Sequence, residues 1–279
     1  MPTLPPQHPP QHPLHAAPQV RESHQARELA ESFGADPERY DRARPRYPAA
    51  LVTAVTAGHP GAAVLDVGCG TGIAARQFRE AGCTVLGVEV DARMADWARR
   101  HGLTVEVAPF ERWESAGRTF DVLVAAQAWH WVDPVTGAVK AAEVLRPGGR
   151  LAVFWNVDQP PAEVAEAFAA VYRRVAPDSL LARRPTTSGP GAYAGLPARA
   201  ADGIRAAGAF GPAEQWRHDW ERSYTRDQWL DLLPTSGAMA QVPPAARARL
   251  LAGIGEAIDA VGGAFTMGYT TLTVTALRS

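Results

Sequence analysis

Cysteine is scarce in this sequence, whose 279 residues include two, Cys69 and Cys83. Their spacing is not the CxxC pair of a zinc site, and two thiols in a chain of this length do not make a disulfide framework. The shortage of cysteine therefore argues against a disulfide-stabilised secreted scaffold. It favours a reducing compartment, the cytoplasm, and gives no reason to expect a metal site.

Long apolar runs and an excess of one charge are missing as well. No stretch approaches the roughly 20 consecutive apolar residues of a membrane span, and the chain does not open with the basic and apolar segments of a secretion signal. The formal net charge is -1, so nothing predicts the concentrated basic face of a nucleic-acid-binding protein. We expect a soluble cytoplasmic protein that binds neither membranes nor nucleic acid. The sequence does not indicate its oligomeric state.

Branched apolar residues are rare in residues 1–27, where proline, glutamine and histidine dominate. Such a segment buries too little apolar surface to offset the entropy of ordering, so a disordered tail is predicted. Its histidines could bind a metal, but prolines hold them apart and no cysteine or carboxylate cluster completes a site. A solvated tail is the favoured interpretation for His8, His12, His15 and His24.

The rest of the chain, residues 28–279, alternates apolar runs with helical stretches. This alternation is typical of a parallel sheet covered by helices. Strands are predicted at 63–67, 84–88, 104–107, 120–125, 150–155, 215–224 and 269–277. Helices are predicted at 27–33, 37–42, 48–58, 73–81, 92–101, 136–145, 226–233 and 244–260, with a turn at 146–149 that ends the sixth of them.

One domain with four parts follows from this order of elements. Residues 28–60 are expected to form N-terminal lid helices, and residues 61–155 a nucleotide-type binding half. Residues 156–212 begin as a helix and continue as a loop through 183–197, which we expect to lie over the carboxyl ends of the strands as a lid or insertion. Residues 213–279 contribute the remaining strands and helices.

The strongest motif is VLDVGCGTG, residues 64–72. It places Asp66 at the end of a buried strand and Gly68, Gly70 and Gly72 in the following turn, where a ligand can approach the backbone closely because no Cβ obstructs it. The next helix begins near Ile73 with free amide groups. Three alternating glycines beside an acid favour a ligand site over a turn that needs glycine for packing alone.

Two nucleotide-type ligands compete for this turn. A dinucleotide prefers GxGxxG, but Ile73 occupies the third glycine position of that spacing. Asp66 would repel a pyrophosphate and attract an ammonium group such as that of S-adenosylmethionine. Glu89, at the end of the second strand, is placed to accept ribose hydroxyl hydrogens from either ligand, whereas Asp91 is interpreted as the cap of the helix from Ala92.

With these motifs in place, the chain resembles the class I S-adenosylmethionine-dependent methyltransferases, particularly the small-molecule branch of the trans-aconitate and ubiquinone-biosynthesis types. The resemblance implies a Rossmann-like α/β fold with a mostly parallel seven-stranded sheet, helices on both faces and a helical lid. It covers about residues 31 to 278. The matching stretches are YDRARPRYP (40–48), VLDVGCGTG (64–72), GVEVD (87–91), FDVLVAAQAWHWVDP (120–134) and LRPGGRLAVFW (145–155).

The resemblance also implies a cofactor, S-adenosyl-L-methionine, and residues that hold it. The glycine turn, including Cys69, would line the methionine and sugar side, and Glu89 would hold the ribose. Adenine would lie between Val90 and Phe110, with Glu111 as the second candidate because this chain lacks the family's usual aspartate. Gln127 would lie between cofactor and substrate. Implied residues of the glycine turn are Asp66, Gly68, Cys69, Gly70 and Gly72.

Methyl transfer from a sulfonium releases a neutral thioether, so positioning dominates and no acid is required. Trp129 or Trp131 could face the sulfonium, and His130 could accept a proton from the substrate. Core packing by the tryptophans and a backbone contact by His130 remain alternatives. Tyr40 and Arg44, with Arg46 nearby, could bind a carboxylate of cofactor or substrate.

The function predicted from the sequence is direct in-line methyl transfer to a small-molecule acceptor. Two alternatives stay open: a non-catalytic S-adenosylmethionine-binding protein that acts through a partner, and an NAD(P)-dependent oxidoreductase, which the glycine spacing disfavours. The sequence specifies neither the substrate nor the atom that is methylated.

Overall fold

The computed structural model describes residues 32–179, 181–183 and 195–279. The tail predicted at 1–27, its four histidines and most of the helix predicted at 27–33 lie outside the described residues. Of that helix, the described part belongs to a short 3₁₀ turn, η2 (Ser32–Ala35). Most of the loop predicted at 183–197 is outside the described residues as well.

Seven strands form one mixed sheet in the order β3-β2-β1-β4-β5-β7-β6. The first five pair in parallel, whereas β7 runs antiparallel to both β5 and β6. The predicted mostly parallel seven-stranded sheet is therefore confirmed. The strands are β1 (Ala63–Val67), β2 (Thr84–Glu89), β3 (Thr104–Val107), β4 (Phe120–Ala126), β5 (Leu145–Gln159), β6 (Glu214–Thr225) and β7 (Ala264–Leu277).

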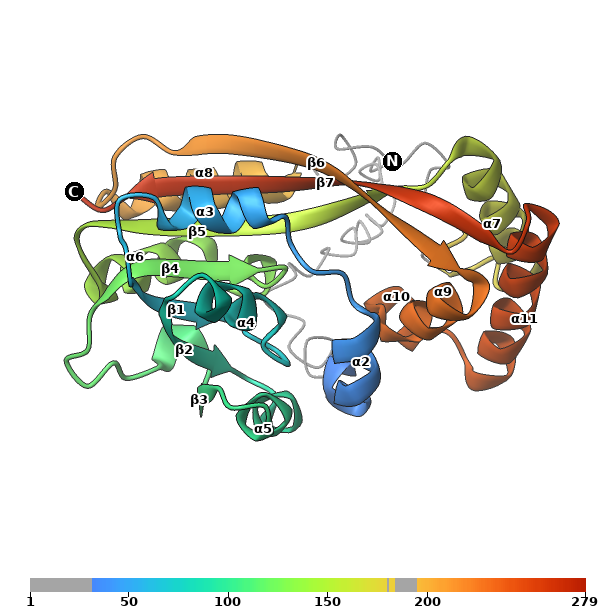
Figure 1. Ribbon diagram of the computed structural model, residues 1–279, viewed down its shortest axis with the longest axis horizontal. Helices are drawn as coiled ribbons and strands as arrows, with labels where there is room; N and C mark the ends of the chain where they lie inside the picture. The colour runs from blue at the N-terminus through green and yellow to red at the C-terminus, as the bar shows by residue number, and fades with distance from the viewer. Residues whose placement is uncertain (1–31, 180, 184–194) are drawn as a thin grey trace, which may run out of the picture.

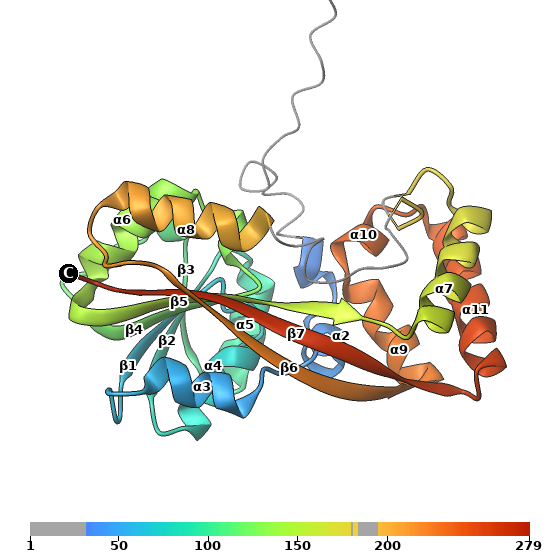
Figure 2. The same ribbon diagram turned by 90° about the horizontal axis from the view of Figure 1, so that it is seen from above.

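Helices cover both faces of the sheet, as Figure 2 shows. Side chains alternate between the faces along each strand, so Val64 of β1 packs with one helical layer and Leu65 with the other. The first layer consists of α3 (Ala49–Thr56), α4 (Ile73–Glu80) and α5 (Ala92–Arg100), and the second of α6 (Pro134–Val144) and α8 (Gly195–Ala207). Both layers bury continuous apolar cores against the sheet.

A second lobe lies beyond the end of this layered core (Figure 1). β5, β6 and β7 are 15, 12 and 14 residues long, against 5 for β1, so they extend past the other strands. Their far ends pack with helices around a separate apolar cluster. These helices are α7 (Ala162–Val175), α9 (Arg226–Leu232), α10 (Gly237–Ala240) and α11 (Pro244–Ala260).

The N-terminal helix α2 (Pro37–Ala43) is tied to the second lobe. Asp231 of α9 accepts hydrogen bonds from Arg39 Nε at 3.1 Å and from Arg42 Nε at 2.9 Å. Asp36 caps the first turn of α2 by accepting from the backbone N–H of Arg39. The segment that follows α2 then crosses from the second lobe to α3 on the layered core (Figure 1).

The three larger differences from the prediction concern the turn at 146–149, the strands β5 and β7, and the helix α8. The turn predicted at 146–149 is part of β5, but the pairing of β4 with β5 shifts register there and Gly148 has φ +75°. β5 and β7 are longer than predicted, because their extensions hold the second lobe and not the sheet core. Helix α8 lies within residues 156–212, the expected lid or insertion, although it contains Gly195, Pro197 and Gly203, which resemble helix breakers.

The position of α8 explains these residues. Helix α8 covers the sheet beside α6, where a Cβ added at Gly203 would lie 2.3 Å from the carbonyl oxygen of Pro134. Glycine is therefore required for the close approach of the two helices. This helix therefore belongs to the layer that covers the sheet.

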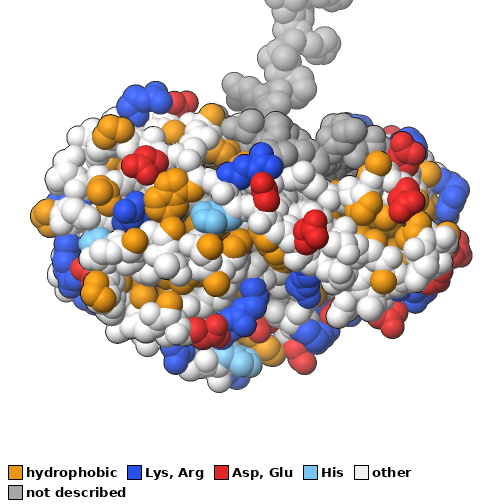
Figure 3. Space-filling model, turned by 45° about the horizontal axis from the view of Figure 1, so that its top comes forward, with side chains coloured by type: hydrophobic (Ala, Val, Ile, Leu, Met, Phe, Trp, Pro, Cys, Tyr) orange, Lys and Arg blue, Asp and Glu red, His pale blue; other side chains and the backbone are white. Residues whose placement is uncertain are grey.

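The visible surface carries charges of both signs in an interspersed pattern (Figure 3). The edge strand β6 exposes Arg217, Asp219 and Glu221 on alternate positions, and such charges discourage pairing with another sheet edge. In the part of the chain that the structure describes, no helix combines the length and apolarity needed to cross a membrane.

Candidate active site

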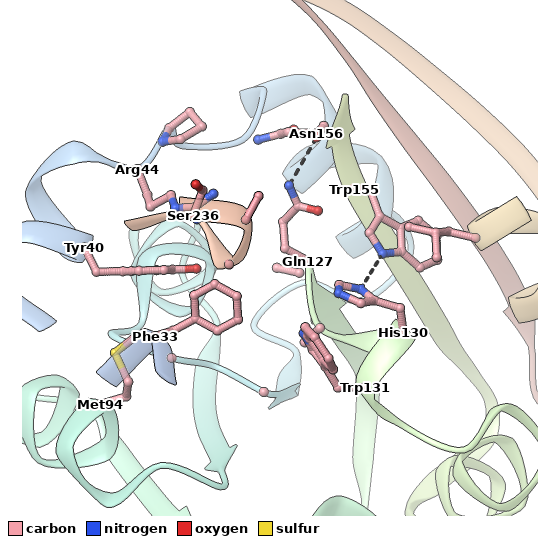
Figure 4. A pocket seen from close by; sticks show the side chains of 18 of the residues that line it. Phe33, Tyr40, Arg44, Met94, Gln127, His130, Trp131, Trp155, Asn156 and Ser236 are labelled. Atoms are coloured by element: carbon pink, nitrogen blue, oxygen red, sulfur yellow. Dashed lines mark hydrogen bonds between the residues drawn. The ribbon is translucent and has the colours of Figure 1, made fainter. Parts of the chain in front are cut away.

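A cavity of about 940 Å³ lies at the carboxyl ends of the parallel strands, between the layered core and the second lobe. Ligands of open α/β sheets bind at this edge. Its core-side wall includes Gly68, Gly70, Glu89, Val90, Phe110, Glu111, Gln127, His130 and Trp131. Opposite them lie Phe33, Tyr40 and Arg44 of the N-terminal segment and, further out, side chains of α7, α9 and β7 (Figure 4).

The glycine turn forms part of the cavity wall. Gly68 and Gly70 have φ +65° and +56°, values that favour glycine. A Cβ added at Gly68 would lie 2.5 Å from Cβ of Ala128, whereas one at Gly70 would point into open space. Gly68 is thus required for packing, and Gly70 leaves room for a ligand beside its backbone.

Gly72 and Cys69, also implied by the resemblance, do not line the cavity. Gly72 precedes α4 with φ +90°, and a Cβ there would lie 2.0 Å from Cδ1 of Leu103. Cys69 is buried against Gly87, and burial raises the pKa of its thiol well above the usual value. Both residues support the turn from behind.

Glu89 holds the glycine turn and faces the cavity. Its Oε2 accepts the backbone N–H of Gly70 at 2.7 Å, and its Oε1 accepts those of Val90 and Asp91, each at 2.9 Å. Burial raises the pKa of Glu89, although the three backbone hydrogen bonds oppose that change. Each oxygen keeps lone-pair capacity for hydroxyl donors of a ligand.

Asp66 lies beneath the turn and not in the cavity wall, contrary to its implied position on the methionine side. Its side chain is fully buried, and neither carboxylate oxygen has a hydrogen-bond partner within the described ranges. Burial and the nearby charge of Glu89 raise the pKa of Asp66 to about 8, and the backbone N–H of Ala75, which lies outside good hydrogen-bond geometry, opposes this increase weakly. An unpartnered buried carboxylate here favours a cation close to the turn.

Beyond the glycine turn, the cavity wall includes the residues implied for the adenine side. Val90, Phe110 and Glu111 line the cavity as implied, and Glu111 Oε1 accepts the backbone N–H of Asp133 at 3.0 Å. Met94 of α5 lines the same cavity and was not singled out from the sequence, because an apolar residue on that helix face also fits core packing. Asp91 caps α5 as predicted, accepting the backbone N–H of Arg93 at 2.9 Å.

Gln127 follows β4 in a strained backbone conformation with φ +58°. Its backbone N–H donates to the carbonyl of Phe154 at 2.8 Å, and its Nε2 donates to the carbonyl of Asn156 at 3.2 Å. Strained residues of this kind cluster at functional sites. The two bonds hold the side-chain carbonyl of Gln127 toward the cavity interior (Figure 4).

His130 and the tryptophans on either side of it have different surroundings. Trp129 is 2% exposed and packs in the apolar core beneath the sheet, so it does not face a sulfonium in the cavity. Trp131 lines the cavity and meets Phe33 edge-on, with ring centroids 6.2 Å apart. His130 accepts at Nδ1 a hydrogen bond from Trp155 Nε1 at 3.2 Å, and burial lowers the pKa of His130 to about 4.

Arg44 and Tyr40 lie together on the opposite wall. The Arg44 guanidinium carbon is 4.9 Å from the Tyr40 ring centroid, and Arg44 Nη2 donates to the carbonyl of Thr235. The Nε of Arg44 is buried with no hydrogen-bond partner in the described part of the chain. Arg46 instead pairs with Glu80 at 2.6 Å on the surface and does not line this cavity.

Comparison with known proteins identifies the layered core. Residues 65–153 match the family described as methyltransferase domain. An uncharacterized methyltransferase of Mycobacterium tuberculosis is 38% identical over 135 residues, 47% of this chain and 54% of that protein. A ubiquinone biosynthesis O-methyltransferase of Chelativorans is 29% identical over 148 residues, 50% of this chain and 52% of that protein. The chain thus spans about half the length of these curated relatives.

A solved structure matches more of the chain. A candidate type II methyltransferase from Anaeromyxobacter dehalogenans is 26% identical, with a TM-score of 0.62, and the alignment covers 84% of this chain and 97% of that one. The strand order, with an antiparallel β7 between β5 and β6, also departs from the 3-2-1-4-5-6 order typical of dinucleotide-binding sheets. The fold, the glycine turn and these matches show that the chain has the class I methyltransferase fold and that residues 65–153 resemble a methyltransferase domain.

Proposed function

We propose that this protein transfers a methyl group from S-adenosylmethionine to a small-molecule acceptor. The observation that carries the proposal is the cavity itself, where an open glycine turn, the ribose-type acceptor Glu89 and an unpartnered buried carboxylate meet at the carboxyl edge of the sheet. A class I methyltransferase fold around such a cavity favours this cofactor over a nicotinamide dinucleotide.

The residues present fit the cofactor group by group. The open space at Gly70 accommodates a ligand against the backbone. Glu89 would hold the ribose hydroxyls, and Val90, Met94 and Phe110 would enclose the adenine. The two charged ends of the methionine part also have counterparts, since the unpartnered Nε of Arg44 suits a carboxylate and the negative charge of Asp66 beneath the turn suits an ammonium.

The cofactor, when bound, supplies an electrophilic methyl group on a sulfonium, and the protein's own task is placement. Gln127, held at φ +58° by two backbone partners, presents a fixed carbonyl oxygen to the acceptor. Trp131 and Phe33 close one side of the cavity and reduce contact with water, and the face of Trp131 suits a nearby cation. Alignment of the reacting groups can contribute several kcal/mol of rate enhancement, on the order of 7 to 11 at most.

Methyl turnover tests the proposal against a non-catalytic binding protein. Purified protein would be incubated with S-adenosylmethionine carrying a labelled methyl group and a small-molecule extract. We expect label in an extract component, at a rate reduced at least about tenfold in Glu89→Gln because a carboxylate contact to the ribose is lost. The matched control is Glu114→Gln, an exposed glutamate outside the cavity, which should keep the wild-type rate. Saturable cofactor binding without any transferred label would instead favour the binding protein.

A further inference from the structure

The outer part of the cavity has an apolar wall that the cofactor contacts do not use. It is formed by helices α7 and α9, the turn after α9, and β7, all in the second lobe. Its side chains are each 9% exposed or less and belong to the apolar cluster of that lobe. We call this wall the distal chamber; its residues are Phe168, Tyr172, Trp229, Leu232, Leu233 and Met267.

Several polar groups around the distal chamber are engaged within the protein, whereas the indole N–H of Trp229 is buried with no hydrogen-bond partner in the described part of the chain. The hydroxyl groups of Tyr269 and Tyr224 bond to each other at 2.7 Å, and the Ser236 hydroxyl donates to the carbonyl of Leu233 at 2.9 Å. Arg44 and Asp158, which also line the cavity, carry opposite charges. The distal chamber therefore offers an apolar surface to part of a ligand, and it does not favour a charged group there.

The cavity volume leaves room for this body beside the cofactor. At about 940 Å³ it lies near the upper end of the roughly 300–1,000 Å³ typical of small-molecule sites. The glycine turn, Glu89 and the residues proposed for adenine occupy the core side, whereas the distal chamber lies on the second lobe. The two parts of this cavity thus differ in chemistry, because the core side combines polar groups with apolar residues such as Val90 and Phe110, whereas the distal chamber is apolar.

His130 lies on the core-side wall, and Trp155 fixes its tautomer. An indole N–H can only donate, so the bond from Trp155 Nε1 at 3.2 Å requires a lone pair on Nδ1 of His130. The neutral ring then carries its proton on Nε2. Among the described residues, Nε2 of His130 has no hydrogen-bond partner, while the ring lies on the cavity wall beside Trp131 (Figure 4).

This tautomer replaces the earlier hypothesis of a general base. A base must present a lone pair, whereas the free nitrogen of His130 presents an N–H. Its partner on a ligand is therefore an acceptor atom, most suitably an oxygen. A carbonyl-type or ionised oxygen close to the reacting atom meets this requirement, and a cationic head group does not.

Resting on the proposed function, we propose that the methyl acceptor is an apolar molecule whose alkyl or aromatic body fills the distal chamber. Its head presents an oxygen that accepts the Nε2–H of His130, with Trp155 as the positioning residue that holds the ring. The chamber selects the body of the acceptor, and His130 selects its head.

Binding of unreactive probes tests this assignment in full-length protein by titration calorimetry, with and without S-adenosylhomocysteine. Octanamide carries both an alkyl body and a carbonyl oxygen, acetamide carries the head without the body, and octyltrimethylammonium carries the body with a cationic head. We expect octanamide to bind at least about tenfold more tightly than either of the others, because each of them lacks one contact.

Substitutions on α7 separate the distal chamber from the outer surface. Ala169 lines the cavity and Ala170, its neighbour, is exposed. Ala169→Phe should weaken octanamide binding about tenfold or more by filling the chamber, and Ala170→Phe should leave it unchanged. His130→Ala should weaken octanamide but not octyltrimethylammonium, and His130→Gln, which keeps an N–H donor, should restore part of the loss.

Several outcomes would overturn the assignment. The assignment would be wrong if the wild-type protein bound acetamide or octyltrimethylammonium as tightly as octanamide. Equal octanamide affinity in Ala169→Phe and Ala170→Phe would overturn it as well. Titration with S-adenosylhomocysteine in the same samples reports on the proposed function separately, since failure of that binding, and not of octanamide binding, would contradict methyl transfer.

Discussion

At the scale of single residues, the site is defined by polar groups whose partners are missing or fixed. Asp66 is buried with no hydrogen-bond partner among the described residues, and His130 has one nitrogen held by Trp155. The sequence predicted that these two residues belong to the site, but it did not predict their burial or their hydrogen-bond partners. Whether a carboxylate lines a cavity or lies beneath its wall depends on the strand face and the turn, which the residue pattern alone does not specify.

Asp66 should destabilise the unliganded fold at neutral pH, because folding must either protonate this carboxyl group or bury its charge. Its folded pKa of about 8 exceeds the unfolded value, so its stabilising contribution is complete only below about pH 4 and is lost as pH rises toward 8. Asp66→Asn should therefore raise the melting temperature and the free energy of unfolding, and the gain in free energy should grow between about pH 5 and pH 8 and reach on the order of 1–3 kcal/mol.

The same Asp66→Asn protein should bind S-adenosylhomocysteine more weakly, because the negative charge beneath the glycine turn is gone. Asp96→Asn is the control, since Asp96 forms an exposed pair with Arg99 that contributes little to stability. Melting curves across pH and calorimetric titrations measure both effects. A melting-temperature difference between wild type and Asp66→Asn that is constant with pH would contradict the buried-charge explanation.

The tautomer of His130 is observable directly. Two-bond ¹H–¹⁵N correlation spectra should show the His130 proton on Nε2 at pH 7, with the signals assigned by their loss in His130→Gln. Trp155→Phe removes the indole donor to Nδ1 and should yield a mixture of tautomers. A proton on Nδ1 in the wild type would exclude the donor role proposed for His130.

At the scale of secondary-structure elements, the sequence predicted the layered core closely and, in the second lobe, the helices α9 and α11 but not the lengths of β5 and β7. β1, β3 and α11 have the predicted bounds, and β2, β4, α4 and α5 differ by one residue, because buried strands and amphipathic helices have clear periods. The apolar residues of α7 and α9 have the same helical pattern as any core helix. Nothing in that pattern distinguishes a side chain that lines a cavity from one that packs in a core.

Helix α8 provides a test of element packing. Gly203→Ala places a Cβ 2.3 Å from the Pro134 carbonyl oxygen, so α8 and α6 must separate, and we expect a loss of about 1–3 kcal/mol in unfolding free energy. Gly195→Ala, where a Cβ meets nothing within 4 Å, should be neutral or slightly stabilising. Chemical denaturation measures the free energy of unfolding of both variants. Equal values for Gly203→Ala and Gly195→Ala would show that α8 and α6 do not pack as described.

At the scale of the whole molecule, two lobes and an N-terminal crossing segment enclose one cavity (Figure 1). The sequence predicted most of the core-side wall, including Gly70, Glu89 and Gln127, since glycines and acids at strand ends are visible as motifs. The opposite wall depends on long strands that carry the second lobe. No local pattern predicts where such a lobe meets the core.

The attachment of α2 to α9 should influence ligand binding, because Tyr40 and Arg44 belong to the segment that α2 anchors. Asp231→Asn removes the negative charge and one of the two acceptor oxygens that Arg39 and Arg42 share, and it should weaken S-adenosylhomocysteine binding about two- to fivefold. Asp227→Asn, whose side chain is 90% exposed, is the control. Unchanged affinity in Asp231→Asn, measured by calorimetry, would show that this attachment is irrelevant to the site.

The central claim is that the cavity binds S-adenosylmethionine, and calorimetric titration of the purified protein with this cofactor and, separately, with NAD tests it most directly. The account predicts saturable binding of S-adenosylmethionine that Glu89→Gln weakens and Glu114→Gln does not, with no heat from NAD. Saturable NAD binding, or an absence of S-adenosylmethionine binding to the folded wild type, would contradict it.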